Sequence, residues 1–260
     1  MFKKGFIHKV TYYNQTEQSA SGLFLNLEND NLKDIRIRKA IAHGLNFDKV
    51  IDQLLRGDYK RLRSFHTGYG EYSNRSVKPL AYSLEKVSSL LDEAGWTSKD
   101  PYGIRMKGKN RLSFSVSYGN KLHEPQIIVL AEEAKKAGIE LKPLYLESTS
   151  FYKNVIEKKH DIAWLGWSTG FRPAYWQHFH SDNAHKSQTN NITNFSDKVI
   201  DELIIQYRES TDEDERIRLA HALEQGIAEQ GVFIPSTMVP FTRAGYWRWL
   251  KLPKTIATKS

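Results

Sequence analysis

A short stretch of the chain gathers the side chains that most readily hold a metal. His178, His180, Asp182 and His185 fall within eight residues, and imidazole and carboxylate groups are common ligands of transition metals. Their spacing matches no dedicated metal motif, and histidines in a loop are commonly hydrogen-bonded surface groups. We therefore expect neither a resident metal nor another cofactor.

The sequence also lacks the patterns that mark catalysis. It contains no glycine-rich phosphate loop, no nucleophile elbow and no HExxH motif. Cysteine is absent, which removes thiol nucleophiles and disulfides. No base, nucleophile and orienting group can be paired from the sequence. We predict that the protein is not an enzyme and has no catalytic residues.

Aromatic residues give a stronger signal. Six of them lie within 16 residues, on an apolar segment and the loop after it: Trp164, Trp167, Phe171, Tyr175, Trp176 and Phe179. Aromatic side chains at the end of a strand can line a cleft that accepts groups of varied shape. Any single one can instead fill the core. As a group they predict a lined binding pocket.

Strand and helix signals indicate how these aromatics are positioned. Period-2 alternation predicts a strand over 112–118, a helix follows from Pro125 towards Gly138, and a second strand is expected over 139–146. This order predicts a right-handed βαβ unit with parallel strands. A strand over 162–167 then enters an irregular segment, 168–196, and a loop of that length is usually functional.

The remaining signals complete an α/β chain. Asp34, Asn46 and Ser83 are N-cap residues for three predicted helices, and Thr211 or Asp212 caps a fourth. The predicted helices cover 35–43, 47–55, 83–94, 150–158, 198–208 and 212–230. Short strands are expected over 23–27 and 232–239, and 58–82 is expected to be irregular. The fold class is α/β or α+β and neither a helix bundle nor a β-sandwich.

Composition narrows the class of protein further. The chain has 260 residues, 40% of them hydrophobic and 26% charged, which is typical of a globular protein. Its net charge of +8 lies at the ends, because residues 1–25 carry +2, residues 240–260 carry +5 and the body, 26–239, carries only +1. Nucleic-acid binders gather cations on one face of the folded body. We expect no nucleic acid as a partner of this domain.

Neither a membrane span nor an export signal is evident in the sequence. No apolar run approaches the length of a membrane-spanning helix. The first nine residues begin with a lysine pair, but His8 and Lys9 interrupt the apolar run that a signal peptide needs. The chain is therefore expected to be either a cytosolic protein or a piece of a longer one.

Several blocks of sequence occur in an order that resembles a known family. They are DIRIRKAI at 34–41 with GLNFDKV at 44–50, YSLEKVSSLLDEAGW at 82–96, NNITNF at 190–195 with VIDELI at 199–204, ER at 215–216 and VFIP at 232–235. Together they are similar to the family 5 solute-binding proteins, the oligopeptide, dipeptide and nickel receptors of bacterial ABC importers. The segments at 175–177, 180–184 and 246–249 resemble the subgroup that imports oligopeptides and microcin C.

This resemblance implies a periplasmic receptor whose two lobes close on an extended peptide and which delivers that peptide to the permease subunits. Family members are roughly twice as long, so the chain looks like their C-terminal half. Residues 26–239 would form the second lobe, of the type II periplasmic-binding-protein kind with a mixed sheet flanked by helices. Residues 1–25 would supply a hinge and first-lobe strand, residues 240–260 would return towards the first lobe, and the receptor is expected to be a monomer.

The resemblance also implies where the ligand binds. The expected ligand-binding residues are Trp164, Trp167, Ser168, Thr169, Gly170, Phe171, Arg172, Tyr175 and Trp176. In dipeptide and oligopeptide receptors, the turn after the Gly-Trp pair carries an Asp that meets the peptide's α-amino group, but residues 168–172 contain no carboxylate. Because an unpaired buried ammonium is costly, we hypothesise that the site takes the interior of a longer peptide or an amine-blocked one. Arg172 would then meet a carboxylate or phosphate of the ligand.

Two alternatives stay open at this point. The same receptor-like domain occurs behind a DNA-binding helix-turn-helix in a class of cytosolic transcriptional regulators, where it senses a ligand. A nickel or haem-chelate receptor of the same family would rely on His178, His180 and His185.

Overall fold

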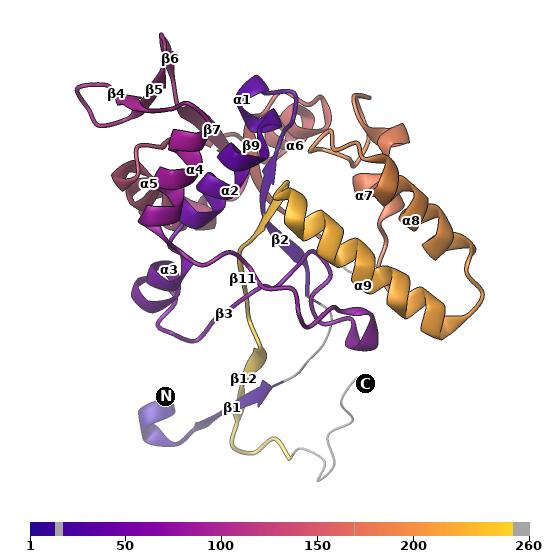
Figure 1. The fold of residues 1–260 in the computed structure, drawn as a ribbon. Coiled ribbons are helices and arrows are strands. Elements are labelled where there is room, and N and C mark those ends of the chain that lie inside the picture. The colour runs from indigo at the N-terminus through magenta and orange to yellow at the C-terminus, as the bar shows by residue number, and fades with distance from the viewer. Residues whose placement is uncertain (14–17, 169, 252–260) are drawn as a thin grey trace.

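The computed structural model describes residues 1–13, 18–168 and 170–251 (Figure 1). Its centre is a five-stranded mixed sheet in the order β10-β2-β9-β7-β8. These strands are β2 (Ala20–Leu25), β7 (Ser113–Tyr118), β8 (Glu140–Tyr145), β9 (Ile162–Trp167) and β10 (Phe233–Pro235). Strand β7 is parallel to β8 and β9, whereas β2 is antiparallel to β9 and β10. The predicted βαβ unit, with helix α5 (Glu124–Lys136) between β7 and β8, is confirmed.

Helices cover both faces of this sheet (Figure 1). Helices α2 (Ile35–Gly44), α4 (Leu84–Glu93) and α5 contribute to one hydrophobic core, and α8 (Lys198–Glu209) and α9 (Glu213–Gln230) to the other. Along β2, Leu23 and Leu25 enter the first core and Phe24 enters the second, because successive side chains of a strand point to opposite faces. The α/β class with a mixed sheet flanked by helices is confirmed.

The predicted N-caps are confirmed where the structure shows them. The side chains of Asp34, Asn46, Ser83 and Asp212 each accept a hydrogen bond from a backbone N–H in the first turn of the helix that follows. Such a cap stabilises a helix by about 1 kcal/mol. Helix α3 (Phe47–Gln53) is shorter than expected, because the chain turns at Arg56 and Gly57, which both have positive φ.

A buried arginine joins helices that are distant in sequence. Arg38 is 4% exposed, and its guanidinium donates to the carbonyl oxygens of Leu32, Lys33 and Gln230. The first two belong to α1 (Asp30–Lys33) and the third ends α9. Arg38 therefore binds the C-terminal ends of two helices while it sits on a third, α2.

Several short elements differ from the sequence-based expectation. A three-stranded sheet that was not predicted consists of β4 (Ser98–Lys99), β5 (Arg105–Lys107) and β6 (Asn110–Arg111). The strand predicted over 232–239 is divided into β10 and β11 (Thr237–Met238), because the Ser236 N–H and hydroxyl both donate to the Ser21 carbonyl oxygen. Strand β11 then pairs with β3 (Lys60–Arg61). The remaining helices are α6 (Ser148–Ile156) and α7 (Trp176–Phe179).

The two ends of the described chain leave the body side by side. Strands β1 (Ile7–Tyr13) and β12 (Phe241–Trp247) form an antiparallel ribbon outside the five-stranded sheet (Figure 1). Arg243 of this ribbon pairs with Asp58 at 2.9 Å. Over residues 1–13, 18–168 and 170–251, no helix combines the length and the apolar character that crossing a bilayer requires.

Candidate functional site

A pocket of about 210 Å³ lies where β9 ends beside the start of β2. We call it the β9 pocket. Its walls come from three parts of the chain: the start of β2, the segment 65–69, and the stretch from Trp167 to His178. The C-terminal end of β9 thus presents the turn that follows it to this pocket, as the sequence predicts for the strand over 162–167.

The inner wall of the β9 pocket is aromatic and uncharged. Trp167 packs against the His178 ring, with centroids 4.9 Å apart. Burial lowers the pKa of His66 to about 3 and that of His178 to about 4, so both imidazoles are neutral at pH 7. The Ala174 N–H donates to His66 Nε2 at 3.2 Å, which places the proton of the neutral ring on Nδ1. Among the described residues, neither that nitrogen nor Trp167 Nε1 has a hydrogen-bond partner.

The structure separates the predicted ligand-binding residues into two groups. Trp167, Ser168, Gly170 and Arg172 line the β9 pocket. Thr169 lies outside the described residues. The other four, Trp164, Phe171, Tyr175 and Trp176, are absent from its lining.

The residues outside this lining have other neighbours. Trp164 is 2% exposed and stacks on His123 in the first core. The Tyr175 hydroxyl donates to the Ala220 carbonyl oxygen inside the second core.

The other two aromatics differ in their surroundings. The Trp176 ring stacks on the His180 ring, with centroids 3.7 Å apart, and the guanidinium of Arg208, in α8, lies over the Trp176 ring. Phe171 is 94% exposed in the turn after β9. Trp176 therefore packs against helix α8 and Phe171 is exposed, and a role in ligand binding stays a prediction for both.

Glu213 holds the turn after β9 against helix α9. Its carboxylate accepts hydrogen bonds from Arg172 at 3.1 Å, from the Tyr72 hydroxyl at 2.6 Å and from Arg216 at 2.9 Å. The guanidinium of Arg172 therefore has a partner within the protein, and both side chains are about half exposed. Two loops that border the β9 pocket are thereby joined to the first turn of α9.

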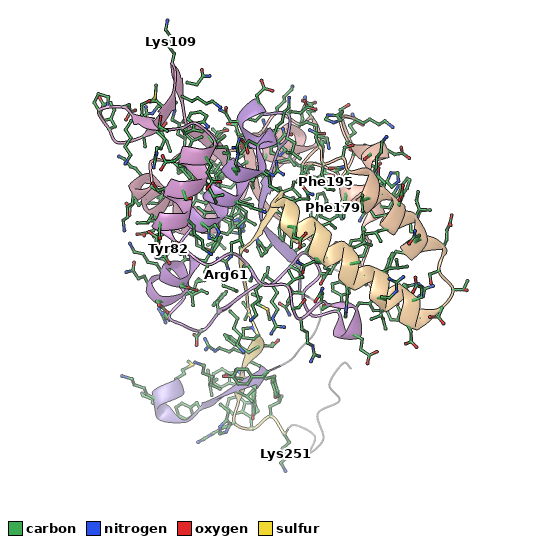
Figure 2. The ribbon with its side chains drawn as sticks, in the orientation of Figure 1. Arg61, Tyr82, Lys109, Phe179, Phe195 and Lys251 are labelled. Carbon is green, nitrogen blue, oxygen red and sulfur yellow. The ribbon has the colours of Figure 1, made fainter. Side chains whose placement is uncertain are left out.

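Sequence reasoning missed the segment 60–75, which borders two further pockets. A basic pocket of about 440 Å³ contains Lys60, Arg61, Arg63 and Arg75. The position of Arg61 can be followed in Figure 2. The only signal in the sequence was the unusual run of cations, Lys60-Arg61-Leu62-Arg63, inside a segment predicted to be irregular.

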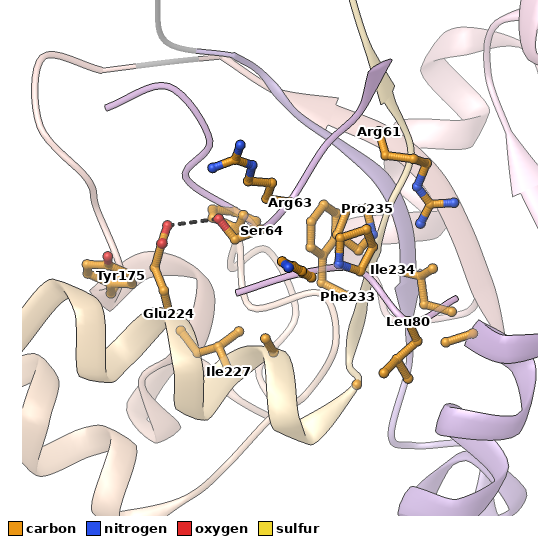
Figure 3. A pocket seen from close by; sticks show the side chains of 16 residues that line it. Arg61, Arg63, Ser64, Leu80, Tyr175, Glu224, Ile227, Phe233, Ile234 and Pro235 are labelled. Atoms are coloured by element: carbon orange, nitrogen blue, oxygen red, sulfur yellow. Dashed lines mark hydrogen bonds between the residues drawn. The ribbon is translucent and has the colours of Figure 1, made fainter. Parts of the chain in front are cut away.

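An apolar cavity of about 60 Å³ lies between the same segment and α9 (Figure 3). Phe233 and Ile227 form part of its wall, and Arg61 and Arg63 contribute to it as well as to the basic pocket. At one side, Glu224 accepts hydrogen bonds from the Ser64 hydroxyl at 3.0 Å and from the Asn74 N–H at 2.6 Å. Burial raises the pKa of Glu224 to about 7.

The histidines considered as metal ligands point to separate neighbours. His178 lies against Trp167, His180 against Trp176, and His185 pairs with Glu28. Within the described ranges, no three His, Cys, Asp or Glu side chains are placed to hold one metal ion. The arrangement can hold a ligand by shape, aromatic contact and charge.

The sequence profile of the bacterial extracellular solute-binding proteins, family 5 (middle part), matches residues 3–186. The chain belongs to this family. Family 5 proteins are solute-binding components and not enzymes, which agrees with the prediction that the chain is not an enzyme.

Two bacterial binding proteins are similar to this chain in sequence. The oligopeptide-binding protein AppA of Bacillus subtilis is 28% identical over 171 residues, which are 62% of this chain and 31% of AppA. The nickel-binding periplasmic protein of Escherichia coli is 24% identical over 151 residues, 56% of this chain and 29% of that protein.

Solved structures of family 5 proteins share the fold. AppA of Bacillus subtilis, in complex with a nonapeptide, superposes with a TM-score of 0.82 at 23% identity, over 95% of this chain and 50% of that one. NikZ of Campylobacter jejuni, in complex with Ni(L-His), gives 0.80 at 21% identity, over 96% and 50%. The chain thus spans about half the length of these solved family 5 proteins.

Proposed function

We propose that this chain forms the second lobe of the substrate-binding component of an ABC importer, which binds an extended oligopeptide and delivers it to the permease subunits. Residues 26–239 are the lobe, and residues 1–25 and 240–260 are the crossings to a first lobe. The receptor acts as a monomer in the periplasm. An oligopeptide-binding relative and a structural neighbour crystallised with a nonapeptide support the choice of ligand.

The position of the pockets beside both ends of the chain carries this proposal. Gln18 and Ala20, which lead from β1 into β2, line the β9 pocket. Met238 and Pro240, which lead into β12, line the basic pocket. In a two-lobed receptor the crossings lie at the cleft between the lobes. Pockets of the second lobe that lie beside the crossings therefore face the first lobe. A ligand held there contacts both lobes and draws them together.

The β9 pocket suits the interior of a peptide better than its amino terminus. Its wall includes two neutral imidazoles and an indole, and among the described residues of its lining the one charged side chain is the cation of Arg172. Residues 168–172 contribute no carboxylate. Glu213 already accepts bonds from two arginines and a tyrosine. An uncharged side chain fits this pocket at little desolvation cost, whereas a peptide ammonium would remain unpaired.

A substitution whose bulky side chain fills the β9 pocket tests this proposal. Ser168 lines the pocket and is exposed, so Ser168→Trp should obstruct it and weaken peptide binding by about tenfold or more. Ser187→Trp, at another exposed loop position, is the matched control and should bind normally. Isothermal titration of the full-length natural protein with a nonapeptide measures both, with free and acetylated N-termini expected to bind alike.

Two results would contradict the proposal. Full affinity in Ser168→Trp would remove the β9 pocket from the binding site. Binding of a Ni(II)–histidine complex without binding of any peptide would replace the proposed ligand class. Cell fractionation tests the location, since a cytosolic protein would favour the ligand-sensing domain of a regulator.

A further inference from the structure

The basic pocket lies across the segment 66–70 from the β9 pocket. Thr67, Gly68 and Gly70 line the basic pocket, while His66 and Tyr69 line the β9 pocket. One short loop therefore separates the two, and an extended ligand that fills the β9 pocket can continue over this loop. What the basic pocket recognises decides which ligands the lobe prefers.

Within the described residues the cations of the basic pocket have no direct ionic partner, although the charge of Asp48 favours the protonated form of Arg61. Among the described residues, Lys60, Arg61, Arg63 and Arg75 form no ion pair, although nearby Arg243 pairs with Asp58. Of the residues that the structure describes, none that lines the pocket is acidic. Glu224, whose carboxyl group is bonded to the pocket wall, is 3% exposed and faces the apolar cavity.

Arg61 is held in place without losing its charge. Its guanidinium lies 3.9 Å from the centroid of the Phe47 ring, and its Nε is buried without a hydrogen-bond partner in the described structure. Burial lowers the pKa of Arg61 to about 10, so it stays protonated at pH 7. A fixed, desolvated cation of this kind gains more from an anion than a mobile surface lysine does.

The neutral donors around the pocket are already used. The Thr67 hydroxyl donates to the Ser64 carbonyl oxygen at 3.1 Å, and the Ser73 hydroxyl donates to that of His66 at 2.6 Å. The Asn74 amide donates to the His221 carbonyl oxygen at 3.0 Å. Among the described side chains of the lining, the four cations therefore offer the free charge to a ligand, and such groups bind carboxylates through charge-assisted hydrogen bonds.

We infer that the basic pocket binds the carboxylate of an acidic side chain of the ligand, so that the receptor prefers peptides containing Asp or Glu. This inference rests on the proposed function, because it assumes that the ligand is a peptide lying along this edge of the sheet. It adds a charge preference at one peptide position to a site whose other pocket has a mainly aromatic wall.

The test compares Glu with Gln at each position of a heptapeptide of alanines, acetylated and amidated so that the ends carry no charge. Isothermal titration of the full-length natural protein should show one position where Glu binds about tenfold more tightly than Gln at low salt. That ratio should fall as ionic strength rises, because the pocket is open to solvent. The Gln peptides should bind with a similar affinity at every position.

Variants assign the preference to the basic pocket. Arg63→Gln combined with Arg75→Gln, both at exposed positions, should lower the Glu-to-Gln ratio severalfold, because two of the four cations are removed while Lys60 and Arg61 remain. Lys109→Gln removes a charge from the turn between β5 and β6, far from Arg61 (Figure 2), and should leave the ratio unchanged.

The outcomes separate this inference from the proposed function. Equal binding of Glu and Gln peptides at every position would overturn the inference and leave peptide binding intact. Tighter binding of an alanine heptapeptide with a free C-terminal carboxylate than of its amidated form, without any Glu-to-Gln difference, would overturn the side-chain assignment. If no heptapeptide and no longer peptide binds, the proposed function is wrong and the inference falls with it.

Discussion

At the scale of single residues, Glu224 is a carboxyl group that the fold keeps from water. Burial raises its pKa from 4.5 to about 7, although the Ser64 hydroxyl and the Asn74 N–H both donate to it. The native state therefore binds this proton more tightly than the unfolded chain does. The stability that protonation contributes is fully present below pH 4.5 and is lost as the pH rises through about 7.

Glu224→Gln should remove this pH dependence. The amide oxygen can accept from the Asn74 N–H and the amide nitrogen can donate to the Ser64 hydroxyl, so the contacts survive without a titrating proton. Between pH 5 and pH 8, the free energy of unfolding of the wild type should fall by about 2.5 kcal/mol more than that of the variant. Urea unfolding at both pH values measures this, with Glu132→Gln, at an exposed position of α5, as the control. Equal pH dependence in all three proteins would show that Glu224 does not titrate as described.

At the scale of secondary-structure elements, one side chain can hold several helices together, as Arg38 does. Its three carbonyl acceptors end α1 and α9, and burial lowers its pKa only to about 10. Arg38→Met keeps most of the volume but leaves buried carbonyl oxygens unpaired. The free energy of unfolding should fall by about 3 kcal/mol, measured by urea denaturation.

A neighbouring cation is the control for Arg38. Lys39→Met removes a charge from the same helix at a partly buried position and should change the free energy of unfolding by less than about 0.5 kcal/mol. Similar losses in the two variants would mean that the three carbonyl contacts of Arg38 contribute nothing specific.

The loops around the β9 pocket depend in the same way on the first turn of α9. Glu213→Gln should loosen the contacts to Tyr72 and Arg172, so hydrogen exchange should become severalfold faster at 70–72 and 170–172. Glu215→Gln breaks only the pair with Arg218 and should not affect these segments. Unchanged exchange in Glu213→Gln would mean that other contacts hold the loops.

The elements that the sequence predicts are those with local causes. Asp34, Asn46, Ser83 and Asp212 cap their helices through bonds to residues two or three positions on, so a short window of sequence contains the information. The ribbon β1–β12 pairs residues more than 200 positions apart, such as Tyr13 and Phe241. No local sequence pattern predicts that pairing, and none predicts the division of the last strand at Ser236.

At the scale of the whole molecule, the site is assembled from segments that the sequence keeps far apart. The end of β9 and Trp167, Ser168, Gly170 and Arg172 were predictable, because the aromatic run and the family resemblance point there. The segment 62–75 was not, since it meets them through contacts such as Gly170 N to Tyr69 Oη and Ala174 N to His66 Nε2, across 101 and 108 positions. The run of cations at 60–63 therefore shares one pocket with Arg75 only in the fold.

Both ends of the chain border the same edge of the sheet, and this joins the pockets to the architecture. Residues at 18–20 and 238–240 line the two pockets, and the proposal that these segments cross to a first lobe would place a bound ligand between the lobes. The chain matches about half the length of its solved relatives, which agrees with a lobe that works with a partner lobe.

The most direct test of this account is a crystal structure of the full-length natural protein with an acetylated, Glu-containing peptide. We expect an extended peptide beside Trp167 and Ser168, with one side chain in the β9 pocket and a Glu carboxylate near Arg63. A peptide bound elsewhere on the lobe, or a metal chelate in place of a peptide, would contradict it.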